Sequence, residues 1–98
     1  METYVILRRG AWSAPDELDA TAARSAKIGD EEMADQVRWI RSYVLAEEDG
    51  SLGTVCVYEA TSPDALRDHA QRVDMPAHEI LPVADTVLVR PDPATSPA

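Results

Sequence analysis

The chain has 98 residues, of which 45% are hydrophobic and 28% charged, and its formal net charge is −9. This length favours one small domain and excludes a two-lobed enzyme with separate cofactor and substrate domains. No apolar run approaches the ~18 residues of a membrane span, and the acidic surplus repels nucleic acid and anionic lipid. The single Cys56 cannot form an intramolecular disulfide, so we expect a reducing cytoplasm, and the short N-terminal apolar run is not expected to be a signal peptide.

The first half of the chain predicts a strand, a helix and a second strand. Residues 4–7 are an apolar, β-branched run, which is typical of a short strand. We expect a helix over residues 13–27, with the side chain of Ser13 capping its first amides and Gly29 ending it. Residues 37–44 alternate in the manner of a second strand.

The second half predicts a hairpin connection, a strand, a helix and a last strand. Residues 47–53 have the Asp-Gly pair and the glycines of a hairpin connection, and residues 54–60 carry the strongest strand pattern of the sequence. Ser62 followed by proline begins a helix over residues 62–72. We expect residues 86–90 to form the fourth strand.

The predicted order β-α-β-β-α-β is that of the ferredoxin-like α+β fold, a four-stranded antiparallel sheet with two helices on one face. This domain is expected to cover residues 1–90, and the proline-rich residues 91–98 are expected to be a disordered tail. At least three strands are apolar on both sides, so the second face of the sheet would expose a large apolar patch. We therefore expect a homodimer that packs these faces together and encloses a space between the sheets.

Several candidate site residues lie on the third predicted strand. Because a strand alternates, we expect Cys56 and Tyr58 to face the space between the sheets and Glu59 to point toward the helices. Cys56 and Glu59 then reach one ion only if the strand bends. Trp39 and Tyr43 are expected to line the same space as Tyr58, as packing for the sheet and dimer or as pocket walls.

His69 shares one stripe of the second predicted helix with apolar side chains, so it should be at least half buried. Such a histidine is either a hydrogen-bonded core residue or, because neutral imidazole suits nickel, zinc or copper, a metal ligand or general base. His78 follows Pro76 in a loop at a sheet edge, where His78 and Glu79 are either solvated or available as ligands.

Several segments, in chain order, resemble a small actinobacterial nickel-binding family described as a domain of unknown function. The similarity spans about residues 3–90. It rests on YVILRR, on WIxSYV from Trp39, on CVYEA from Cys56, on the His69-Ala70 pair, on MPA from Met75 and on VADTV from Val83.

The resemblance implies a ferredoxin-like fold, a dimer in the manner of the dimeric α+β barrels, and a nickel site. Carried over by position, it assigns recurring polar positions to Cys56, Tyr58, Glu59 and His69, with His69 the firmest. His78 lies in a stretch where the family varies, so its part in a metal site would belong to this chain alone.

Three functions stay open from the sequence. The first is a dimeric protein that binds a divalent metal ion, nickel first, although zinc, cobalt or copper could take its place. The second is a cofactor-free enzyme of the monooxygenase or isomerase type, with His69 as acid or base and Tyr58 or Tyr43 positioning the substrate. The third is a non-catalytic dimer module. Metal binding is the preferred interpretation, and the sequence does not distinguish metal storage from sensing.

Overall fold

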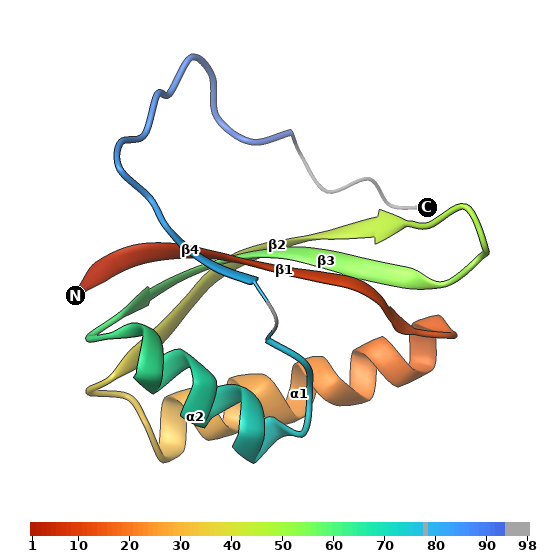
Figure 1. Cartoon of the computed structure of the whole chain (residues 1–98), viewed down its shortest axis with the longest axis horizontal. Coiled ribbons are helices and arrows are strands. Elements are labelled where there is room, and N and C mark those ends of the chain that lie inside the picture. The colour runs from red at the N-terminus through yellow and green to blue at the C-terminus, as the bar shows by residue number, and fades with distance from the viewer. Residues whose placement is uncertain (78, 94–98) are drawn as a thin grey trace.

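The computed structural model describes residues 1–77 and 79–93. Its four strands form one antiparallel sheet in the order β2-β3-β1-β4, and both helices cover the same face of that sheet (Figure 1). This arrangement confirms the predicted ferredoxin-like β-α-β-β-α-β fold. In chain order the elements are β1 (Glu2–Trp12), α1 (Pro15–Glu31), β2 (Val37–Ala46), β3 (Leu52–Ala60), α2 (Pro63–Val73) and β4 (Glu79–Pro82).

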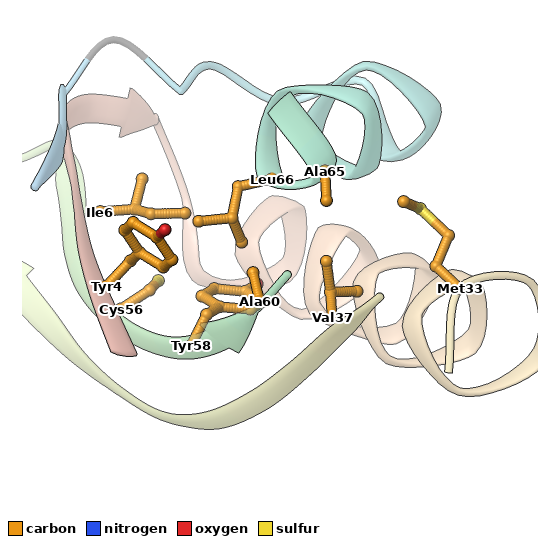
Figure 2. Packing of buried hydrophobic residues seen from close by; sticks show 9 residues of the cluster. All are labelled: Tyr4, Ile6, Met33, Val37, Cys56, Tyr58, Ala60, Ala65 and Leu66. Atoms are coloured by element: carbon orange, nitrogen blue, oxygen red, sulfur yellow. The ribbon is translucent and has the colours of Figure 1, made fainter. Parts of the chain in front are cut away.

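The hydrophobic core lies between the sheet and the two helices. In Figure 2, Leu66 of α2 reaches down between Ile6 of β1 and Tyr58 of β3, and all three side chains are buried. The face of the sheet toward the helices is called the inner face below, and the opposite face the outer face. The remaining members of the core cluster are Tyr4, Met33, Val37, Cys56, Ala60 and Ala65.

The second helix follows its prediction closely. The Ser62 hydroxyl accepts a hydrogen bond from the Ala65 amide at 3.1 Å, as expected of an N-cap residue. The helix ends at Asp74, which adopts the left-handed conformation. The predicted apolar stripe is buried along its whole length: Ala65, Leu66, His69, Ala70 and Val73.

The first helix differs at both ends from its prediction. Its N-cap is Ala14, whose methyl group cannot make a capping hydrogen bond, and the Ser13 hydroxyl instead donates to Glu17 Oε2 at 2.8 Å. The helix also continues through Gly29 to Glu31, because Gly29 has an ordinary helical conformation and packs near His69 and Val37. A glycine inside a helix lowers its stability without ending it.

The fourth strand is Glu79–Pro82, so its predicted position at residues 86–90 was wrong. These four residues pair with β1 directly after the loop that follows α2, and they leave no free edge on β1 for a later segment. Residues 86–90 are exposed and form no strand. The misplaced prediction arose because TVLVR has strand-like composition, which does not decide which segment reaches the sheet edge.

The chain after β4 crosses the outer face of the sheet (Figure 1). The Val83 amide donates to the Thr3 carbonyl at 2.9 Å, beside β1. Asp92 then accepts hydrogen bonds from Arg41 and from the Tyr43 hydroxyl on β2, at the opposite edge of the sheet. The last described residues of the predicted tail are therefore tied to the domain, and residues 94–98 lie outside the described residues.

The predicted faces of β3 are inverted in the structure. Cys56 and Tyr58 are 5% and 1% exposed and face the helices, whereas Val57 and Glu59 lie on the outer face. The alternation of side chains along a strand predicts which residues share a face. It does not decide which face the helices cover when both faces are apolar.

An irregularity in the pairing between Trp39 and Arg41 shifts the faces along β2. Trp39 therefore pairs with Tyr58 on the inner face, while Tyr43 pairs with Val55 on the outer face. The prediction that Trp39 and Tyr43 share one face is wrong for this reason. None of the helices in the described part of the chain is long and apolar enough to cross a membrane.

Candidate functional site

A cavity of about 490 Å³ lies between α1 and the inner face of β2 and β3. Both tryptophans of the chain line it, Trp12 at the end of β1 and Trp39 on β2. Its other apolar walls come from Leu18, Ala22, Ile40, Val44 and Met75. Its polar lining includes Arg8, Ser42, Thr54, Cys56 and Tyr58.

Arg8 is the most unusual residue of this cavity, because a long cationic side chain is only 1% exposed. Its Nε donates to the Pro76 carbonyl at 2.5 Å, and Nη1 donates to Cys56 Sγ at 3.2 Å. Its Nη2 is buried and makes no hydrogen bond within the described residues. None of the ion pairs formed among those residues involves Arg8.

Cys56 lies in a small polar cluster beside this guanidinium. The Ser42 hydroxyl donates to Cys56 Sγ at 3.0 Å, and Thr54 Oγ1 lies 3.4 Å from the same sulfur. The sulfur is therefore surrounded by Arg8, Ser42 and Thr54, and a cationic neighbour disfavours the approach of a metal cation.

His69 occupies a hydrogen-bonded core position. The side chain is 1% exposed, its Nε2 lies 3.1 Å from the Ser25 carbonyl on α1, and its ring meets the edge of Tyr58 at a centroid distance of 5.6 Å. Burial lowers the pKa of His69, and the hydrogen bond to the Ser25 carbonyl partly offsets that shift. A neutral imidazole that donates through Nε2 fits these contacts.

Tyr58 connects His69 to the large cavity. Its hydroxyl shares a 3.2 Å hydrogen bond with Ser25 Oγ, and its ring stacks on Trp39 at a centroid distance of 6.3 Å. Burial raises the pKa of Tyr58, so this hydroxyl stays protonated at neutral pH.

The other predicted site residues lie elsewhere. Glu59 is on the outer face, where its Oε1 accepts a hydrogen bond from Arg38 at 3.0 Å. Tyr43 is on the same face, and its hydroxyl donates a hydrogen bond to Asp92. His78 lies outside the described residues. The prediction that Glu59 points toward the helices is corrected by this pairing.

The donor set in the described part of one chain does not fit a nickel centre. No three histidine, cysteine, aspartate or glutamate side chains among residues 1–77 and 79–93 come close enough to hold one metal ion. His69 Nε2 contacts the Ser25 carbonyl, Cys56 faces Arg8, and Glu59 pairs with Arg38.

The first strand, predicted over residues 4–7, extends over Glu2–Trp12 in the structure, so the prediction left Arg8 outside the strand and missed its place in the cavity. The alternation of Tyr4, Ile6 and Arg8 could have placed the guanidinium on the buried face of a longer strand. The partners of Arg8 come from β3 and from the loop after α2, far away in the sequence, so no local pattern predicts that one guanidinium nitrogen stays unpaired.

Comparison with known proteins identifies the family of the chain. The family model described as "Nickel responsive protein SCO4226-like" matches residues 4–83. The chain belongs to this family. The crystal structure of SCO4226 from Streptomyces coelicolor A3(2) is similar, with 19% sequence identity and a TM-score of 0.68 over 87% of this chain and 99% of that chain. At this identity the likeness shows the shared fold alone, and none of the curated proteins matches the chain.

Proposed function

We propose that this member of the nickel responsive family binds a divalent metal ion, nickel first, as a homodimer in the cytoplasm. The observation that carries the proposal is the family match over residues 4–83. The single cysteine of the chain agrees with a reducing compartment.

The homodimer is part of the proposal because one chain does not supply a ligand set within its described residues. The outer face carries Val5, Leu7, Val55 and Val57 in half-buried positions beside the exposed Leu81. A two-fold dimer through this apolar face places each contributing side chain in the interface twice. A metal ion in this interface could then be bound by the same few side chains from both copies.

The four residues of the predicted ligand set are candidates, and their surroundings favour two of them, Glu59 and His78. Glu59 comes first, because its carboxylate lies on the outer face and is about one-third exposed. His78 is the second histidine of the chain and the second candidate. His69 and Cys56 come last, because each would have to leave its buried contacts to reach a metal ion.

The test is a calorimetric titration of untagged protein with nickel, preceded by metal analysis of the purified protein by mass spectrometry. We expect near-stoichiometric nickel binding by the wild type and a loss of about tenfold or more in affinity for Glu59→Gln and His78→Gln. His69→Gln and Cys56→Ser should leave the affinity close to that of the wild type.

Asp64→Asn is the matched control, since Asp64 is an exposed acid on α2 that pairs with Arg67. Its nickel affinity should not change. A wild-type protein that carries no nickel and shows no heat of binding would contradict the proposed function. A loss confined to His69→Gln would instead restore the sequence-based ranking of the ligands.

A second candidate is the cofactor-free enzyme, which the cavity of about 490 Å³ favours. The predicted acid or base, His69, is separated from that cavity by Tyr58 and does not line it. We therefore rank the enzyme below metal binding.

A further inference from the structure

We infer that the cavity between α1 and the sheet binds a small organic carboxylate with an apolar body. The cavity is on the inner face, whereas Glu59, the first proposed metal ligand, is on the outer face, so binding in the cavity does not depend on nickel. It rests on the buried Arg8 and on the chemistry of the cavity walls.

Arg8 is a buried cation whose hydrogen bonds are incomplete. A guanidinium has five N–H donors, and the described contacts use Nε and Nη1 but not Nη2. A buried charge is costly unless an opposite charge accompanies it, and no described carboxylate forms an ion pair with Arg8. A ligand carboxylate would supply both the missing acceptor and the missing charge.

The wall around Arg8 suits the head of such a ligand. Ser42 and Thr54 line the same cavity from β2 and β3, and both contact Cys56 Sγ beside the guanidinium. The Ser42 hydroxyl already donates its proton to Cys56 Sγ, whereas Thr54 Oγ1 accepts from that thiol, so the Thr54 hydroxyl is the one that can donate to an oxyanion. The other cation of the cavity, Arg41, is already paired with Asp92.

The rest of the cavity suits an apolar body rather than a second charged group. Trp12, Trp39 and Leu18 form walls that hydrate poorly, and the volume of about 490 Å³ is typical of small-molecule sites. A dianion such as inorganic phosphate would meet one unpaired guanidinium and the carboxylate of Asp19, which also lines the cavity. We therefore favour a monocarboxylate.

The chain as a whole repels anions, since its formal net charge is −9. A preference for a carboxylate over its neutral analogue must consequently come from a local cation. Arg8 is the cation in the described cavity that has no carboxylate partner.

The experiment titrates metal-free protein with octanoate and, separately, with octan-1-ol, which has the same apolar chain and no charge. Tryptophan fluorescence reports binding, because both tryptophans of the chain line the cavity. We expect saturable binding of octanoate with an affinity about tenfold or more above that of octanol. Equal affinities, or no change with either compound, would overturn the inference.

Three variants locate the site. Arg8→Met keeps a long apolar side chain and should abolish the preference for octanoate while octanol still binds. Ala22→Leu narrows the cavity with Arg8 intact and should weaken both compounds. Arg38→Met removes an exposed arginine of the outer face and should change neither affinity.

Far-UV circular dichroism establishes that each variant is folded before it is titrated. If Arg8→Met does not fold, Ala22→Leu still decides whether the compounds occupy the cavity. Octanoate preference that persists in Arg8→Met, or binding that Ala22→Leu leaves unchanged, would contradict the assigned site.

Discussion

The buried His69 makes the stability of the fold depend on pH. Its pKa is lowered in the folded protein, mainly by burial, so below about pH 6.5 the unfolded chain binds a proton that the folded chain does not. The free energy of unfolding should therefore fall as the pH drops through this value, by at most about 1.4 kcal/mol per pH unit. Urea denaturation between pH 5 and pH 7.5 measures this slope.

The variant His69→Gln removes the titrating group and can still donate a hydrogen bond to the Ser25 carbonyl. Its free energy of unfolding should be nearly flat over this range, whereas that of the wild type should fall toward low pH. Hydrogen bonds with Ser13 and Arg9 lower the pKa values of Glu17 and Glu47. The stability that these two carboxylates contribute to the fold is therefore lost only below this pH range. A wild-type slope in His69→Gln would show that another group titrates.

The sequence predicts the burial of His69 but not its partners. The helical stripe that places His69 on an apolar face is local, and all its members are buried in the structure. The Ser25 carbonyl and the Tyr58 ring come from α1 and β3, which approach His69 only through the tertiary fold. The same limit applies to Arg8, whose partners belong to β3 and to the loop after α2.

At the scale of the elements, the structure requires a glycine at position 53 but has room for a larger side chain at position 29. A Cβ on Gly53 of β3 would lie 2.5 Å from the Arg8 carbonyl oxygen, whereas a Cβ on Gly29 of α1 would meet only ordinary contacts at 3.5 Å and beyond. Gly53→Ala should therefore destabilise the protein by about 1–3 kcal/mol, because a backbone atom must move.

Gly29→Ala should stabilise the protein by up to about 1 kcal/mol, because alanine loses less conformational freedom in a helix than glycine. Thermal and urea denaturation of the two variants give both values. If Gly53→Ala were as stable as the wild type, β1 and β3 would not approach as closely as they do here. A destabilised Gly29→Ala would show that α1 presses more tightly on His69.

Elements whose boundaries depend on local chemistry were predicted correctly from the sequence. The helix start at Ser62 and the hairpin before β3 depend on local chemistry, and both are present in the structure. The fourth strand and the irregularity after Trp39 depend on competition for the edges of the sheet and on its twist. The composition of a segment reports neither the competition for an edge nor the twist. Residues 86–90 therefore have the composition of a strand, although Glu79–Pro82 pairs with the edge of β1.

At the scale of the whole molecule, the two faces of the sheet have different surroundings. The helices cover the inner face, while the outer face is crossed by residues 83–92 (Figure 1). That crossing leaves Val87, Leu88 and Val89 between 75% and 83% exposed. Exposed apolar residues on both the crossing segment and the sheet are typical of a surface that packs against a partner.

The proposed dimer interface can be tested with two exposed apolar residues that lie on opposite faces. Leu81 of β4 pairs with Val5 on the outer face and is 49% exposed, and Val44 of β2 pairs with Thr54 on the inner face and is 53% exposed. Because both are exposed in the single chain, a lysine at either position should leave the fold intact. Leu81→Lys, however, would bury a charge in a dimer formed through the outer face.

Size-exclusion chromatography with light scattering should therefore find a dimer for the wild type and for Val44→Lys, and a monomer for Leu81→Lys. Matched melting temperatures would show that the change lies in association and not in folding. A monomeric wild type at micromolar concentration would contradict the dimer itself. If Val44→Lys dissociated while Leu81→Lys stayed dimeric, the second copy would instead pack near the open edge of the cavity, and the metal ligands of the outer face would have to come from one chain.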